Sequence, residues 1–162
     1  MPFSNSAVTS SDTLTLRTPP IQGTDTSTVC VRYPVTLTAA DLANGVVGAL
    51  GILPAGHIPV AFELDAAQLD SNGTPTLAYS VGILNAAQSA IDTAAANGGA
   101  AWATGQTIGR TAGGSASGIV PSRPLKLVQQ TQQDRMVGIA LTAAAATAVA
   151  GQIALTLWYR PA

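Results

Sequence analysis

Residues 60–83 read VAFELDAAQLDSNGTPTLAYSVGI, and this stretch decides the fold. Val60, Phe62 and Leu64 alternate with smaller or charged residues, and a second alternation of the same kind runs from Leu77 to Ile83. Because successive side chains of a strand point to opposite faces, each segment offers one apolar face to a core. The stretch therefore predicts two amphipathic β-strands.

The residues between these two segments favour a reversal of the chain. The sequence Asp70-Ser71-Asn72-Gly73-Thr74-Pro75 contains an Asn-Gly pair, which tolerates positive φ, and a proline, which cannot donate to a strand ladder. We therefore predict a β-hairpin with a long loop. A single sheet would leave its apolar face in water unless a second sheet covered it, so the stretch predicts a sandwich.

The segment from Val137 to Tyr159 is uncharged and flanked by Arg135 and Arg160, as in a membrane-spanning helix. Its Val, Ile, Leu and Tyr residues all fall on odd positions, however, which scatters them around a helix but aligns them on one face of a strand. We therefore predict a second hairpin, with strands Met136 to Thr142 and Gln152 to Arg160, and no membrane span.

The rest of the chain predicts short strands separated by turns. Val29 to Leu37 predicts a strand that Pro34 confines to a sheet edge or a bulge. Thr38-Ala39-Ala40-Asp41 resembles a capping box before one helical turn. Further expected elements are a bulged strand over 46–53, a short helix over 86–96, a weak strand over 106–111 and a strand beginning at Leu125. About eight strands predict an all-β antiparallel sandwich, for which a jelly roll is the commonest arrangement.

The chain divides into an extended N-terminal arm, residues 1–28, and a β-sandwich domain, residues 29–162. The arm is rich in Ser, Thr and Pro, and only Leu14 and Leu16 alternate in it before Pro19-Pro20. Such an arm is either a frayed terminus or an attachment device that adds a strand to an exposed sheet edge. We expect the second, with the two leucines entering pockets of a neighbouring subunit.

The composition indicates a surface made for contact with other proteins. Charged residues make up 9% of the chain, against roughly 25% in ordinary soluble proteins, while hydrophobic residues make up 47% and the net charge is -1. A surface this poor in charge is weakly protected against association. It suits a protein covered by other subunits, although a soluble monomer is an alternative. The absence of a Lys/Arg cluster argues against nucleic-acid binding.

The residues offer no convincing catalytic, cofactor or metal site. His57 is the only histidine and follows a Pro-Ala-Gly turn, where we expect a solvated or carbonyl-bonded imidazole rather than a catalytic base. Cys30 is the only cysteine, and we expect a small buried or sheet-facing hydrophobe. Glu63, Asp65 and Asp70 fit turns or solvent better than a calcium site. We therefore expect a protein that is not an enzyme and needs no cofactor.

The aromatic residues provide the best candidates for a contact with a partner. Trp158 follows Leu157 and precedes Tyr159, so it points to the face of the last strand opposite to theirs. There it is either an interface anchor, which we favour, or a stacking platform for a sugar. The candidate interface residues are Leu14, Leu16, Trp102 and Trp158.

Four stretches resemble the small virion proteins of tailed bacteriophages. They are Thr36 to Leu42, Leu53 to His57 continuing into Pro59-Val60, Leu69 to Leu77, and the tail from Asp134-Arg135 through Leu155 to Arg160. Within that group the chain most resembles capsid decoration, or cement, proteins of jelly-roll type. The resemblance covers roughly residues 29–161.

The resemblance implies a structural protein of the virion, with no catalytic residues. Its partner would be the major capsid protein, and it would form symmetric homo-oligomers, dimers or trimers, over junctions between capsid subunits. It would be made in the host bacterial cytoplasm and would stiffen the exterior of the shell, with no nucleic acid and no membrane as partners. The alternatives are a phage tail or head-tail joining protein, or a host- or carbohydrate-binding sandwich module.

Overall fold

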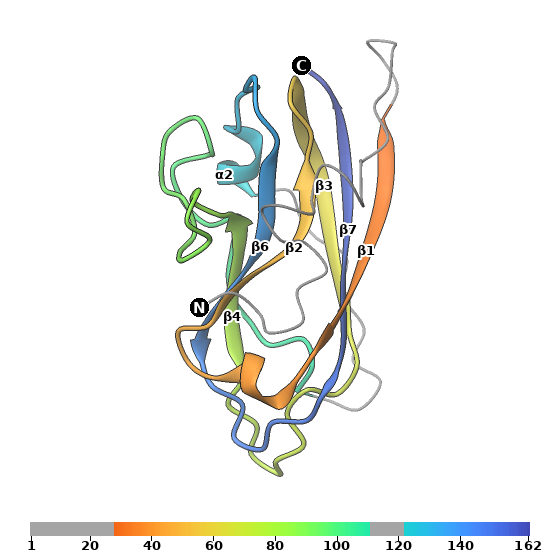
Figure 1. Ribbon diagram of the computed structural model, residues 1–162, viewed down its shortest axis with the longest axis vertical. Helices are drawn as coiled ribbons and strands as arrows, with labels where there is room; N and C mark the ends of the chain where they lie inside the picture. Colours follow the sequence, from red (N-terminus) through yellow and green to blue (C-terminus); the bar gives the residue numbers. More distant parts are fainter. Residues whose placement is uncertain (1–27, 111–121) are drawn as a thin grey trace.

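The chain folds into a sandwich of two antiparallel sheets (Figure 1). The computed structural model describes residues 28–110 and 122–162. In these residues the strands are β1 (Val29–Leu37), β2 (Val47–Leu53), β3 (His57–Ala66), β4 (Ala78–Ile83), β5 (Ala103–Gln106), β6 (Arg135–Ala143) and β7 (Gly151–Pro161). Sheet A has the order β1-β7-β3, and sheet B has the order β2-β6-β4-β5. The predicted all-β antiparallel sandwich is confirmed.

The strand order is that of a jelly roll with one strand fewer in the described residues. From β1 to β4 the chain alternates between sheets A and B, and β5, β6 and β7 then lie in B, B and A. An eight-stranded jelly roll would place one more strand, between β5 and β6 in sequence, at the edge of sheet A beside β3. In that part of the sequence the structure describes the short helix α2 (Arg123–Lys126), which contacts β3.

Both predicted hairpins are wrong in their pairing, although their strands form. The strands from the stretch 60–83 are β3 and β4, which pair with β7 and β6 in opposite sheets. The two C-terminal strands, β6 and β7, also lie in opposite sheets. The connections, residues 67–77 and 144–150, cross between the sheets, which stacked sheets place about 10 Å apart. A loop of this length does not force the two strands that it connects to pair with each other, whereas a two-residue turn does.

The period-two pattern correctly gives the faces of most strands. On β1, Val29, Tyr33, Val35 and Leu37 are buried while Cys30 and Arg32 are exposed. The strand is an edge strand, as Pro34 predicts. Cys30 is exposed on the outer face of sheet A, so of the two alternatives expected for it, a buried or a sheet-facing hydrophobe, the buried one is wrong.

Two β-bulges shift the faces. Within β3 the register with β7 slips between Pro59 and Ala61, and Val60 is 38% exposed, so the inward position that the alternation predicts for Val60 is wrong. Within β2 the register with β6 slips between Ala49 and Gly51, which confirms the bulge expected there.

Three local predictions have different outcomes. The turn after Thr38 is a 3-10 helix, η1 (Ala39–Leu42), and the Thr38 N–H donates to Oδ2 of Asp41 at 2.8 Å, as in a capping box. The expected helix over 86–96 is instead a series of turns, which covers the outer face of sheet B through Ile91. The expected strand at Leu125 is the helix α2, with Ser122 as its N-cap.

The core between the sheets is apolar and carries most of the large side chains. Phe62 of β3 and Trp102, just before β5, lie in it with ring centroids 5.6 Å apart. Strand β5 ends at Gln106, so the expected strand over 106–111 overlaps it by one residue. No helix of the described residues is long and apolar enough to cross a membrane, and the segment 137–159 forms strands as predicted.

Candidate functional site

The outer face of sheet A carries the candidate interface residue Trp158. Its neighbours in the sheet are Cys30 of β1 and Ala61 of β3, and its side chain is half-buried between them. Leu157 and Tyr159 are fully buried on the opposite face, as predicted. Both of these neighbours are small side chains, and Trp158 is the large apolar residue of this face that the sequence singled out for a contact with a partner.

An ion pair spans the same face. Arg32 of β1 donates to Asp65 of β3 from Nε at 3.2 Å and from Nη2 at 2.5 Å, over the central strand β7. The hydrogen bond with Asp65 raises the pKa of Arg32, and the charge of Asp65 acts in the same direction. Both side chains are close to half exposed, so the pair contributes little to the stability of the fold. Its main effect is to link the two edge strands of sheet A across this face.

Of the other candidate interface residues, Trp102 lies in the part of the chain that the structure describes. Trp102 is 2% exposed in the core, which corrects the expectation that it contacts a partner. Trp102 lies in the core because it directly precedes β5 and its backbone N–H donates to the carbonyl oxygen of Val81 in β4. Leu14 and Leu16 lie outside the described residues.

Asp70 does not belong to a carboxylate cluster but organises a turn. Its side chain is fully buried and accepts backbone N–H groups from Thr76, Leu77, Ala146 and Thr147 at 2.8 to 3.1 Å. Burial alone would raise the pKa of Asp70, but these hydrogen bonds outweigh it and hold the pKa well below its usual range. This confirms Asp70 as a turn-forming acid.

The remaining acids and the histidine form no reactive constellation. Glu63 and Asp65 lie on the outer face of sheet A, whereas Asp70 is buried in the loop that follows β3. His57 is buried, its Nδ1 lies 2.7 Å from the carbonyl oxygen of Ala55, and its ring packs edge-on against Tyr159. The carbonyl-bonded imidazole is confirmed. Within residues 28–110 and 122–162, no His, Cys, Asp and Glu side chains gather in a group that could hold a metal ion.

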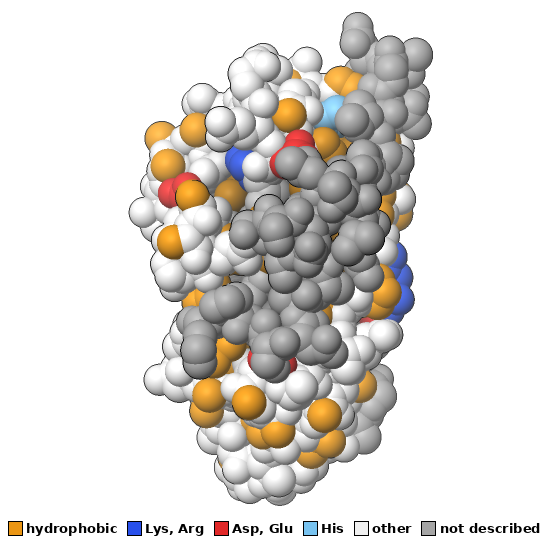
Figure 2. All heavy atoms as spheres, in the orientation of Figure 1, with side chains coloured by type: hydrophobic (Ala, Val, Ile, Leu, Met, Phe, Trp, Pro, Cys, Tyr) orange, Lys and Arg blue, Asp and Glu red, His pale blue; other side chains and the backbone are white. Residues whose placement is uncertain are grey.

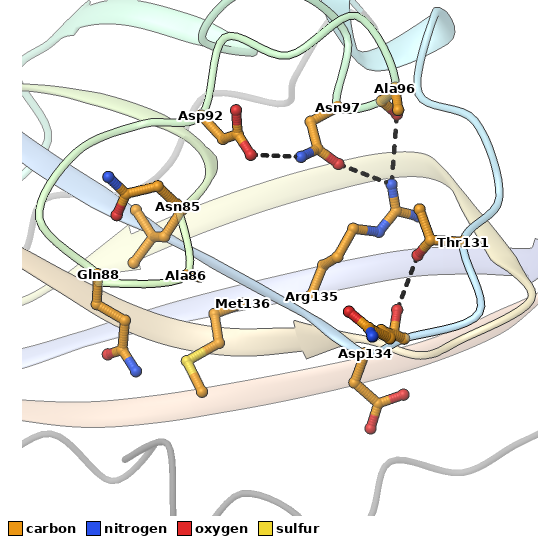
Figure 3. Close-up of a pocket in the computed structure, with 12 residues that line it drawn as sticks. Asn85, Ala86, Gln88, Asp92, Ala96, Asn97, Thr131, Asp134, Arg135 and Met136 are labelled. Carbon is orange, nitrogen blue, oxygen red and sulfur yellow. Dashed lines mark hydrogen bonds between the residues drawn. The ribbon is translucent and has the colours of Figure 1, made fainter.

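A polar pocket of about 350 Å³ lies between the turns of residues 84–97 and the start of β6 (Figure 3). Arg135 is buried beside it and donates to Oδ1 of Asn97 at 3.0 Å and to the carbonyl oxygen of His57 at 3.2 Å. Asn97 in turn donates to Asp92 at 2.7 Å, so its amide connects the two charges. Burial lowers the pKa of Arg135.

The sequence does not reveal this pocket because Arg135 meets its partners only through tertiary contacts. Its hydrogen-bond acceptors lie 38 to 78 residues away in the chain. Three of the groups that line the pocket, Asp92, Asn97 and Arg135, already bond to one another, as Figure 3 shows. We therefore interpret this cluster as a support for the turns that cover sheet B.

The chain is similar to proteins from phage capsids. The sequence matches no protein-family model, and no curated protein matches it. Among solved structures it resembles a chain from the capsid of Ralstonia phage GP4, with a TM-score of 0.74 and 27% identity over 91% of this chain and 93% of that chain. A chain of the cyanophage Pam1 capsid asymmetric unit shares the fold, with a TM-score of 0.59 and 22% identity over 96% of this chain and 99% of that one. This chain therefore resembles chains of phage capsids, in fold for both structures and in sequence at 27% identity for the first.

Proposed function

We propose that this chain is a capsid decoration, or cement, protein that binds the outer surface of the major capsid protein shell and stabilises it. The observation that carries the proposal is the likeness to a chain of the Ralstonia phage GP4 capsid, which extends over nearly the full length of both chains. A sandwich of this size, without a reactive constellation in its described residues, suits a structural part in the particle.

The surface chemistry supports this proposal. Charged residues make up only 9% of the chain, so contacts with other subunits remove few charges from water. On the outer face of sheet A, Trp158 is half-buried between Cys30 and Ala61. A partner that covers this face would bury the indole at the centre of the contact, where tryptophan contributes most.

The chain acts as a homo-oligomer, a dimer or trimer, in this proposal. The Trp158 face is the contact between neighbouring copies on the shell. The N-terminal arm, residues 1–28, extends over a neighbouring subunit, and Leu14-Thr15-Leu16 adds a strand to a sheet edge there. Backbone hydrogen bonds of the added strand would supply the affinity, and the side chains of Leu14 and Leu16 would give specificity by entering pockets of the neighbouring subunit.

The test is binding of the purified full-length chain to phage shells that were assembled without it. We expect saturable binding to the outside of the shell and a higher temperature of shell disruption when the sites are filled. Immunogold labelling of intact particles locates the chain independently. Labelling of the tail or of the head-tail junction alone, with no binding to shells, would contradict the proposal in favour of a tail or joining protein.

A further inference from the structure

One end of the sandwich exposes no charged side chain from its loops. We call it the loop end, and it consists of residues 38–46, 67–77 and 144–150, at the bottom of Figure 1. The exposed residues of these loops are Ala39, Ala40, Ala43, Asn44, Gly45, Ala67, Ser71, Asn72, Gly73, Thr74, Thr76, Ala146, Thr147, Val149 and Ala150. The two acids within the loops, Asp41 and Asp70, are buried.

The charges of the described residues lie elsewhere. Asp92, Arg123, Lys126, Asp134 and Arg160 belong to the opposite end of the sandwich, where the chain also terminates. In the view of Figure 2 the lowest part of the molecule shows only hydrophobic and uncharged groups, and the red and blue groups lie above it. Arg32, Glu63 and Asp65 lie on the outer face of sheet A, between the two ends. The loops of one end therefore expose no charged side chain, while the opposite end and the face of sheet A carry most of the charges of the described residues.

Arg110 contacts the loop end, where the loop 67–77 holds its guanidinium in place. Its Nε donates to the carbonyl oxygen of Leu77 at 2.6 Å, and its Nη2 donates to that of Thr76 at 3.0 Å. The guanidinium is thus directed at backbone of the loop 67–77 and is half-buried. It fastens this loop rather than adding a free charge to the loop end.

Hydrogen bonds join the three loops into one rigid surface. Asp70 accepts N–H groups from Thr76 and Leu77 of its own loop and from Ala146 and Thr147 of the next. The Thr76 hydroxyl donates to the carbonyl oxygen of Ala144 at 2.7 Å, and the Ala145 N–H donates to Leu42 at 3.1 Å. Loops held in this way lose little conformational freedom when they bind a partner.

We propose that the loop end is the surface by which this protein sits on an uncharged surface of the capsid shell. The inference rests on the proposed function and names the part of the chain that carries out the binding. Loops that expose no charged side chain of their own, with Val149 38% exposed among alanines, can be buried without removing an ion of these loops from water. Chains similar to this one occur in phage capsids, which makes the shell the occupant that we expect.

The orientation follows from the same asymmetry. With the loop end on the shell, the charged end faces outward into solvent, where charges keep particles apart from one another. The Trp158 face of sheet A then lies on the side of each molecule, where it meets a neighbouring copy. The two contacts use separate residues, so they can be tested separately.

The experiment adds one charge of either sign to the loop end. Ala146 is exposed and only its backbone takes part in the bonds to Asp70, so we choose Ala146→Lys and Ala146→Glu. The matched controls are Ala95→Lys and Ala95→Glu, because Ala95 is an exposed loop alanine at the opposite end. Thermal unfolding of each free variant checks that the sandwich is intact, and binding to shells assembled without this chain is then measured.

Both Ala146 variants should bind the shell at least about tenfold more weakly, whichever the sign, because either charge must be desolvated. Both Ala95 variants should bind like the wild type. Wild-type-like binding by both Ala146 variants would overturn this inference while the proposed function stands. Opposite effects of Lys and Glu would also overturn it, since they would indicate a charged partner surface.

Two further outcomes identify the occupant. If the Ala146 variants lose self-association in sedimentation but still fill the shell, the loop end is a contact between copies and the inference is wrong. If the wild type itself does not bind shells, the result contradicts the proposed function, and with it the inference that depends on that function. Weaker shell binding with unchanged sedimentation supports the inference.

Discussion

The ring of Tyr33, on β1, lies so close to the backbone of Gly51, on β2, that a Cβ at Gly51 would be 2.5 Å from Cδ2 of the ring. The Tyr33 hydroxyl donates to the carbonyl oxygen of Ile52 at 3.2 Å. β1 is an edge strand of sheet A, and β2 is an edge strand of sheet B. This contact therefore closes one side of the sandwich, and it requires a residue without a side chain at the bulge of β2.

Replacement of Gly51 by alanine should destabilise the sandwich. The added methyl group must displace the buried Tyr33 ring, and such overpacking costs about 1 to 3 kcal/mol of unfolding free energy. Urea unfolding measures the loss. Gly73→Ala is the matched control, because nothing lies within 4 Å of a Cβ at Gly73. Equal stability of the two variants would contradict the close contact.

Asp70→Asn should destabilise the loop end. An amide nitrogen in place of Oδ2 would face the backbone N–H groups of Thr76, Leu77 and Ala146. In place of Oδ1 it would face those of Asn72 and Thr147. We expect a loss of about 2 to 4 kcal/mol, because each buried donor left without an acceptor costs about 1 to 3 kcal/mol. Urea unfolding at neutral pH gives the value. An unchanged unfolding midpoint would show that Asp70 does not hold the loops.

The stability of the wild type should fall with pH in acid partly because of Asp70. The pKa of Asp70 is depressed in the folded state, so its contribution is complete above the unfolded value of about 3.9 and is lost as the pH falls below it. Asp70→Asn lacks this titration, so the difference in stability between the two proteins should shrink below about pH 4. A constant difference from pH 6 to pH 2 would contradict the depressed pKa.

Trp158→Ala should weaken self-association and leave the fold intact. The side chain lies outside the core, so its removal opens no core cavity, whereas an aromatic at an interface centre contributes on the order of 2 kcal/mol. Sedimentation and occupancy of particles measure the loss. Gln152→Ala, at an exposed position of the same strand and face, is the control. Identical behaviour of the two variants would remove Trp158 from the interface.

Cys30 should react quickly with a maleimide in the free monomer and slowly in the assembled particle. Its thiol is exposed beside Trp158 on the outer face of sheet A, so a partner that covers the indole also covers the thiol. Mass spectrometry of both forms gives the ratio of the labelling rates. Equally fast labelling in intact particles would show that this part of the face stays open to solvent.

Removal of residues 1–25 tests the proposed arm. The sandwich strands begin at Val29, so the truncated protein should melt at nearly the same temperature as the full chain. We expect lower occupancy of particles and earlier release in salt or heat, because strand addition by the arm is lost. If the truncated chain fills and protects particles as fully as the intact one, the arm is only a terminus.

The sequence by itself determined which segments are strands and, for most residues, which side chains face the core. Alternation along β1, β4 and β7 is local information, because each side chain's face follows from its own position in the strand. The same holds for the outward position of Trp158 beside Leu157. The sparse charge, also visible in the sequence, indicated a surface for contact with other subunits.

Only the tertiary structure decided how the strands pair and where the loops meet. An amphipathic pattern states that one face of a strand is covered, but not which strands lie at its edges, so β3 and β4 were expected side by side and lie in opposite sheets. Burial of Trp102 and the turns over residues 86–96 likewise depend on distant partners. The loop end is made by loops from three distant parts of the chain, because the sandwich brings together residues that the sequence separates by up to about 100 positions.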